Sequence, residues 1–180
     1  MEECKYKQAI CFLVMYNLSE KQMGIQCSHA QNEYEILFGN TPEYIRWSYN
    51  DKTVLMMDGG TSNRTGQNNY NDEIKLGSME KKFILLNEIG FNVAAFYEPD
   101  LNNSTSAIAF LVDERIYNKD LYPDPNIFDL LTEEEAKIPN FVSCLNNKEI
   151  SERKLNYFAN FFNDGKIAWL RIFYSKLKRA

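Results

Sequence analysis

The sequence predicts an α/β fold: a three-layer sandwich with a small, roughly four-stranded mixed sheet flanked by helices, followed by a C-terminal helical extension. Up to about residue 115, apolar runs of strand length alternate with segments of helical spacing, an order typical of α/β proteins. Beyond the turn-forming segment YPDPN at 122–126, helical patterns dominate. We therefore expect an α/β domain over residues 1–118 and a helical extension over residues 119–180.

Four apolar runs predict the strands of the sheet. The run QAICFLVMY within residues 7–16 is continuously apolar and suits a central strand that is covered on both faces. The other strands are expected at residues 52–58, at FNVAAFY directly after Gly90, and at TSAIAFLVDE from Thr105. The polar, turn-rich stretch over residues 59–72 predicts a surface loop.

Capping residues and apolar periodicity predict the helices. Ser19 is a candidate N-cap of a long helix over residues 20–38, whose apolar residues recur at helical spacing. The sequence TPE from residue 41 begins a second, short helix that is expected to reach about Trp47. A third, amphipathic helix is expected over residues 78–90.

The C-terminal extension is expected to hold two or three helices. A helix N-terminus is indicated at Thr132, and aromatic and aliphatic residues recur at helical spacing over residues 150–178. Its aromatic side chains are expected to pack in a core rather than to stack on RNA bases. A basic end could meet phosphate, although such charge is also ordinary at a helix C-terminus. Its members are Lys166, Arg171, Lys176, Lys178 and Arg179.

Composition excludes several classes of protein. The 180 residues are 44% hydrophobic and 25% charged, and no apolar run is long enough to span a bilayer. The first residues, MEECKYKQ, lack the features of a secretory signal, so we expect a cytoplasmic protein without membrane contact. The formal net charge of −5 argues against nonspecific coating of nucleic acid but leaves a local basic patch open. Four separated cysteines and a single histidine argue against a zinc site, and no metal or other cofactor is expected.

The string KQMGIQCSHA, residues 21–30, carries the most specific functional signal. It follows a buried strand, begins a helix, and resembles the motif of the archaeal and eukaryotic-type (type II) peptidyl-tRNA hydrolases, which its segment QCSHA matches closely. The agreement in the order and spacing of elements extends over residues 7–114. This resemblance implies hydrolysis of the ester bond of peptidyl-tRNA without a cofactor, with peptidyl-tRNA as partner and a homodimer as assembly. The resemblance does not extend beyond residue 118. The C-terminal helices are therefore candidates for binding a protein or RNA.

Two departures from the family's pattern concern its functional residues. Where the family has a glycine and then a lysine, this chain has Lys21 and then Gln22, so the lysine is missing from its own position. Where the family has an aspartate before Ala-Gly-Arg-Thr, this chain has Glu98 before Pro-Asp-Leu. The carboxylate is therefore kept, whereas the glycine and the arginine are lost.

The chemistry of ester hydrolysis suggests roles for the matching residues. The reaction needs an activated water, a donor to the developing oxyanion, and groups that hold the substrate. We expect Glu98 to orient or deprotonate water, and Lys21 or Lys52 to polarise the carbonyl. Thr105, a further catalytic candidate, and Gln26 are expected to fix the substrate. Glu98 and Thr105 are both expected to lie at strand ends that face the long helix.

The resemblance adds His29 as a catalytic candidate and Gln22 and Ser28 as substrate-binding candidates. Simpler interpretations remain open for several of these residues. Gln22, Gln26 and His29 share one helical face, as they would on any half-solvated helix. Cys27 is expected to be a core residue rather than a nucleophile.

A second function is open from the sequence. Glu98 can equally lie in a solvated turn, and Thr105 can simply begin a strand. A noncatalytic module that binds tRNA or a protein on the same fold is therefore the alternative to the hydrolase.

Overall fold

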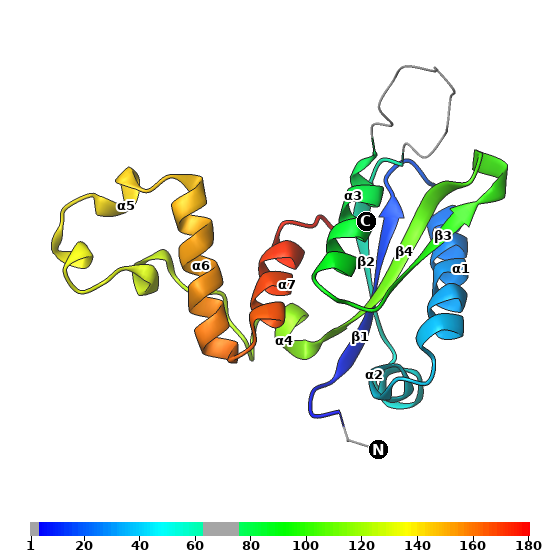
Figure 1. Ribbon diagram of the computed structural model, residues 1–180, viewed down its shortest axis with the longest axis horizontal. Coiled ribbons are helices and arrows are strands. Elements are labelled where there is room, and N and C mark those ends of the chain that lie inside the picture. The colour runs from blue at the N-terminus through cyan, green and yellow to red at the C-terminus, as the bar shows by residue number, and fades with distance from the viewer. Residues whose placement is uncertain (1–3, 63–75) are drawn as a thin grey trace. The chain divides into compact units, whose positions relative to one another are not determined.

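The structure, a computed structural model, describes residues 4–62 and 76–180 (Figure 1). The chain forms two compact units. The first comprises Met1–Glu114 together with Leu177–Ala180, and the second comprises Arg115–Lys176. The loop that we expect between the second strand and the third helix lies largely outside the described residues.

Within the described residues, a four-stranded mixed sheet forms the centre of the first unit. Its strands are β1 (Gln8–Met15), β2 (Thr53–Gly60), β3 (Val93–Glu98) and β4 (Ser104–Asp113), in the spatial order β2-β1-β4-β3. β1 runs parallel to β2 and antiparallel to β4, and β3 is antiparallel to β4. The predicted α/β class with a mixed sheet is confirmed.

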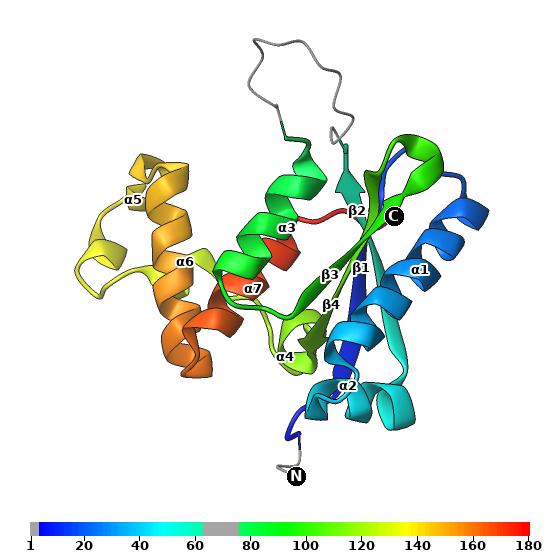
Figure 2. The same ribbon diagram turned by 45° about the vertical axis from the view of Figure 1, so that its right-hand side comes forward.

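Helices cover both faces of this sheet. α1 (Glu20–Phe38) begins at the predicted N-cap Ser19. The short helix α2 (Pro42–Arg46) is continued by a π-helical turn, η1 (Trp47–Asp51), so the helical segment runs further than the sequence predicts. Figure 2 shows α1 and α3 (Ser78–Glu88) on opposite sides of the sheet, which is the three-layer arrangement expected from the sequence.

The burial of β1 explains why this strand is apolar throughout. All of its residues are buried, because α1 covers one face of the sheet and α3 the other. The face toward α1 forms a cluster whose buried members include Phe12, Val14, Cys27, Tyr34 and Trp47. Each large side chain buried in this way contributes roughly 1.5–3 kcal/mol, so the helix that carries the KQMGIQCSHA string is firmly anchored on the sheet.

The last residues of the chain pair with the edge of the sheet. Residues 178–180 form an antiparallel bridge and two backbone hydrogen bonds, of 2.8 and 3.2 Å, with residues 56–58 of β2. The sequence places them at the basic end of the last helix, but α7 (Gly165–Ser175) ends before them. The edge position of β2 explains the difference, because an edge strand has backbone groups that an extended segment can satisfy.

The second unit, which the structure describes in full, is mostly helical. Its long helices are α6 (Asn147–Phe162) and α7, which are joined through Asn163 in the left-handed conformation and Asp164 as the N-cap of α7. Shorter helical turns precede them: α4 (Glu114–Tyr117), η3 (Ile127–Leu130), η4 (Glu135–Lys137) and α5 (Phe141–Cys144). The predicted helical extension is confirmed. Nowhere in the described residues is a helix both long and apolar enough to cross a membrane.

Arg171 holds the start of the second unit against α7. Its side chain is 1% exposed, and its guanidinium donates to the backbone carbonyls of Arg115, Ile116 and Tyr122. It also forms an ion pair with Asp124 at 3.1 Å. Because its guanidinium is buried, Arg171 is not available for the contact with phosphate that the sequence suggests for the basic residues.

Candidate functional site

Most of the predicted site residues lie near one end of the sheet. There β1 ends at Met15, β3 ends at Glu98 and β4 begins at Ser104, and α1 starts shortly after β1. The strand register fixes this arrangement, because Glu98 pairs with Ser104 and Ala107 pairs with Val14. The ends of three neighbouring strands therefore meet the first turns of α1.

A chain of hydrogen bonds connects three side chains at this end. The hydroxyl of Ser106 donates to Oε1 of Gln26 at 2.6 Å, and Nε2 of Gln26 donates to Oε2 of Glu98 at 2.5 Å. Ser106 is fully buried, Gln26 is 8% exposed and Glu98 is half-buried. The carboxylate of Glu98 can only accept a hydrogen bond, so the NH₂ group of Gln26 must face Glu98 and its oxygen must face the hydroxyl of Ser106. Gln26 thus holds Glu98 as a hydrogen-bond acceptor at the edge of the first unit.

A bulge in β4 brings Ser106 to Gln26. Phe96 of β3 pairs with Ala107 of β4, but the next residue, Tyr97, pairs with Thr105, so Ser106 has no counterpart on β3. Such an extra residue re-aims side chains at the end of a strand. Ser106 is not among the predicted site residues, because nothing in the local sequence signals the bulge.

The same bulge separates Thr105 from Glu98. The register pairs Thr105 with Tyr97 and Glu98 with Ser104, and neighbouring residues of a strand point to opposite faces. Thr105 therefore lies on the face of the sheet away from Glu98, and it is 2% exposed. The expectation that Thr105 and Glu98 face α1 together is wrong, since a shift of one residue exchanges the faces.

Gln22 has a structural role at the start of α1. Its Oε1 accepts from the backbone N–H of Ser19 at 3.0 Å and from the Ser19 hydroxyl at 2.8 Å, and the two residues form a capping box. Gln22 lies four residues before Gln26 and so shares its face of the helix. The amide of Gln22, a predicted substrate-binding residue, is thus engaged in the capping box of α1.

Lys21 and Ser28 point away from the face of α1 that carries Gln26. Lys21 precedes Gln26 by five residues, which places it about 140° around the helix, and Ser28 follows by two residues, about 160° away. Both side chains are exposed. The structure does not bring these two candidates together with Glu98, because each is out of phase with Gln26.

His29 follows Gln26 by three residues on α1, so the two residues share one face of the helix. Its side chain is exposed, and its ring stacks on Phe96, with the centroids 4.5 Å apart and the planes 24° from parallel. Phe96 is two residues before Glu98 on β3, so both residues lie on the same face of the sheet. The ring of His29 therefore lies on the same side of the sheet as Glu98 and Gln26.

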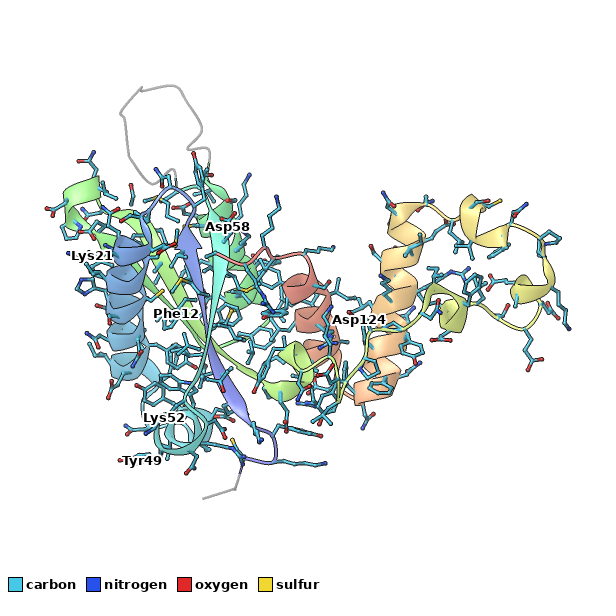
Figure 3. All side chains as sticks on the ribbon, turned by 180° about the vertical axis from the view of Figure 1, so that it is seen from behind. Phe12, Lys21, Tyr49, Lys52, Asp58 and Asp124 are labelled. Atoms are coloured by element: carbon cyan, nitrogen blue, oxygen red, sulfur yellow. The ribbon has the colours of Figure 1, made fainter. Side chains whose placement is uncertain are left out.

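Lys52 lies at the opposite end of the sheet. It directly precedes β2, where Thr53 pairs with Ala9 at the start of β1. Figure 3 shows Lys21 at one end of the first unit and Lys52 at the other. Lys52 has a left-handed backbone with φ of 51°, and its N–H caps the π-helical turn by bonding to the carbonyl of Trp47. The structure does not bring Lys52 to Glu98, because Lys52 precedes the first residue of β2 whereas Glu98 lies where β1 and β3 end.

A second polar cluster lies at the same end of the sheet, toward α3. Oε1 of Glu80 accepts from the Ser62 hydroxyl at 2.5 Å, and Oγ of Ser62 accepts from the backbone N–H of Thr105 at 2.9 Å. Glu80 is 7% exposed, and its Oε2 has no hydrogen-bond partner in the described part of the chain. Glu80 is not among the predicted site residues, because in the sequence it is an ordinary carboxylate in the first turn of a helix.

The cysteines of the described residues are free thiols, and Cys27 belongs to the core. Burial raises the pKa of Cys27 to about 12, and the residue belongs to the core cluster, as expected. Cys4, Cys11 and Cys144 are likewise free thiols. Across residues 4–62 and 76–180, no group of three or more His, Cys, Asp or Glu side chains is placed to hold a metal ion.

No protein-family model, curated protein or solved structure matches this chain.

Proposed function

We propose that this chain hydrolyses the ester bond of peptidyl-tRNA, or of an N-blocked aminoacyl-tRNA, and thereby releases tRNA. The resemblance of KQMGIQCSHA to the archaeal and eukaryotic-type peptidyl-tRNA hydrolases supports the proposal. The observation that carries it is the hydrogen bond of 2.5 Å from Gln26 to Glu98. This bond joins a motif residue to the carboxylate that stands where the family has its aspartate. In this proposal the protein acts in the cytoplasm and needs no cofactor.

The arrangement suggests a division of labour between the side chains. Glu98 accepts a proton from a water molecule as that water attacks the ester carbonyl. The bond from the carbonyl carbon to the ribose oxygen of tRNA then breaks, and Glu98 returns the proton to that oxygen. Gln26 is a positioning residue, because its amide holds one carboxylate oxygen and leaves the other to meet water. Ser106 fixes the amide of Gln26 in turn. The side-chain Nε2 of Gln22 is the candidate donor to the oxyanion, since the oxygen of this amide is bound to Ser19.

The test is the rate at which purified protein hydrolyses N-acetyl-aminoacyl-tRNA. Glu98→Gln keeps an oxygen that can accept from Gln26 and removes the negative charge. We expect the rate to fall by at least about a hundredfold, the typical contribution of a general base. Asp100→Asn is the matched control, because Asp100 is an exposed carboxylate two residues along the same loop. Equal rates for the wild type and Glu98→Gln, with intact folding, would refute the role of Glu98.

A second function is favoured by one observation. Gln22 occupies the family's lysine position and caps α1, whereas Lys21 lies on another side of the helix. A chain without this cation fits a noncatalytic module that binds tRNA or a protein. In that case the wild type does not hydrolyse the substrate, and Glu98→Gln binds tRNA as well as the wild type does.

A further inference from the structure

The second unit contains a cleft of about 600 Å³ between α6, α7 and the segment that precedes η3. Its charged lining consists of Lys119, Lys154, Lys176 and Asp124. Three cations and one anion leave two positive charges in the cleft. This excess stands out in a chain whose formal net charge is −5.

The single acid of the cleft is already paired. Asp124 lies 2.5 Å from the ammonium of Lys119 and 3.1 Å from the guanidinium of Arg171. Burial alone would raise the pKa of Asp124, but the hydrogen bond from Lys119 and the charge of Arg171 outweigh it and keep this pKa below its usual range. The acid therefore stays ionised and is neutralised by its two partners. Lys154 and Lys176 form no ion pair with any carboxylate that the structure describes.

The remaining wall of the cleft is partly apolar. Ile150 and Phe158 contribute from α6, and Ile172 contributes from α7. Phe158 is 3% exposed and stacks on Phe162 with the ring centroids 5.6 Å apart, so its position in this wall is supported by packing. A volume of this size lies in the range of small-molecule sites and exceeds what a bare inorganic anion fills.

We propose that this cleft binds a small organic phosphate, namely a phosphomonoester of about nucleotide size. The phosphate group, with a charge of about −1.5 to −2 at pH 7, balances the charges of Lys154 and Lys176. The organic part packs against the apolar wall of Ile150, Phe158 and Ile172. This site lies within the second unit, and its existence does not depend on the hydrolase activity proposed above.

The experiment is titration calorimetry of the full chain with AMP, inorganic phosphate and adenosine. We expect AMP to bind at least about tenfold more tightly than either fragment, because only AMP presents both the charge and the apolar body. Lys154→Gln and Lys176→Gln should each weaken AMP binding by about fivefold, the effect of one exposed ion pair. Lys154→Arg keeps the charge and should retain binding. Lys148→Gln is the matched control, because Lys148 lies on α6 outside the cleft and its side chain is 86% exposed.

Several outcomes would overturn the proposal. AMP that does not bind, or that binds equally to the wild type and to both glutamine variants of Lys154 and Lys176, excludes the cleft as its site. An equal loss of affinity in Lys148→Gln would mean a general effect of charge instead of a site. Binding of a single-stranded RNA with the same lysine dependence, but not of AMP, would replace the small molecule by a nucleic acid. Unchanged thermal unfolding of each variant confirms that the comparison concerns binding.

Discussion

Arg171→Met should destabilise the second unit. Methionine fills much of the same volume but removes the donors to three backbone carbonyls and the partner of Asp124. Breaking a buried charge pair costs about 3–5 kcal/mol. We expect a value near the lower end, about 3 kcal/mol, because the side chain of Asp124 is 40% exposed and its carboxylate regains water. With a slope of about 1 kcal/mol per molar urea, this loss lowers the unfolding midpoint by about 3 M.

The two tryptophans of the chain allow each unit to be followed separately. Trp47 is 5% exposed in the core of the first unit, and Trp169 stacks on Phe173 in α7 with the ring centroids 5.1 Å apart. In a Trp47→Phe background, fluorescence during urea unfolding therefore reports on Trp169 alone. Arg171→Met should shift this transition strongly. In a Trp169→Phe background, the transition of Trp47 should move much less.

The control for this experiment is Lys148→Met, which removes a charge from the exposed surface of the same unit. It should change the midpoint by less than about 0.5 M, as expected for a surface substitution. A midpoint of the Trp169 transition that is unaffected by Arg171→Met would refute the role of the buried guanidinium. Equal shifts of both tryptophan signals would mean that the two units unfold as one.

Two further predictions concern single hydrogen-bonded groups. Ser106→Ala leaves Oε1 of Gln26 buried without its donor, so the first unit should lose about 1–3 kcal/mol of unfolding free energy, measured through Trp47; an unchanged value would mean that the amide finds another partner. Glu135 accepts a bidentate pair of hydrogen bonds from Arg153, both of 2.8 Å, which lowers the pKa of Glu135 from 4.5 to about 2. Because the folded-state pKa is depressed, the stabilisation is present above pH 4.5 and is lost as the pH falls toward 2. Acid unfolding followed by Trp169 should show this loss in the wild type and not in Glu135→Gln, and identical acid transitions in the two proteins would contradict it.

Local patterns in the sequence were sufficient for the individual strands and for α1. The apolar run of β1 predicts a strand covered on both faces, and all of its residues are buried. The N-cap Ser19 is confirmed, because capping depends on residues only three positions apart. These features involve neighbours in the chain, so the sequence contains the whole signal.

Features that depend on distant partners could not be predicted in this way. Ser106 reaches Gln26 through a bulge, which arises from the pairing of β3 with β4 and not from either strand alone. Arg171 looks like one of several surface cations in the sequence. It is buried because carbonyl groups about fifty residues earlier in the chain accept its hydrogen bonds. The structural roles of Ser106 and Arg171 can therefore be recognised only in the folded structure.

Gln22 provides a test that separates the two proposed functions. Its side chain completes the capping box with Ser19 at the position where the proposed hydrolase would need a lysine. Lysine has no acceptor atom and cannot accept the hydrogen bond from the Ser19 N–H that the oxygen of Gln22 accepts. Gln22→Glu keeps this acceptor but loses the amide donor, so it should preserve stability and abolish any hydrolysis that relies on the donor. Gln22→Lys removes the side-chain bond to the Ser19 N–H but leaves Ser19 as the N-cap, so it should cost about 0.5–1.5 kcal/mol of stability, the value of one hydrogen bond. If the chain is a binding module that lacks the catalytic cation, Gln22→Lys should gain hydrolysis of N-acetyl-aminoacyl-tRNA. Adding Lys21→Gln to the wild type or to the Gln22→Lys variant should leave the rate of either protein unchanged. A wild-type rate that is unaffected by Gln22→Glu would remove Gln22 from the mechanism.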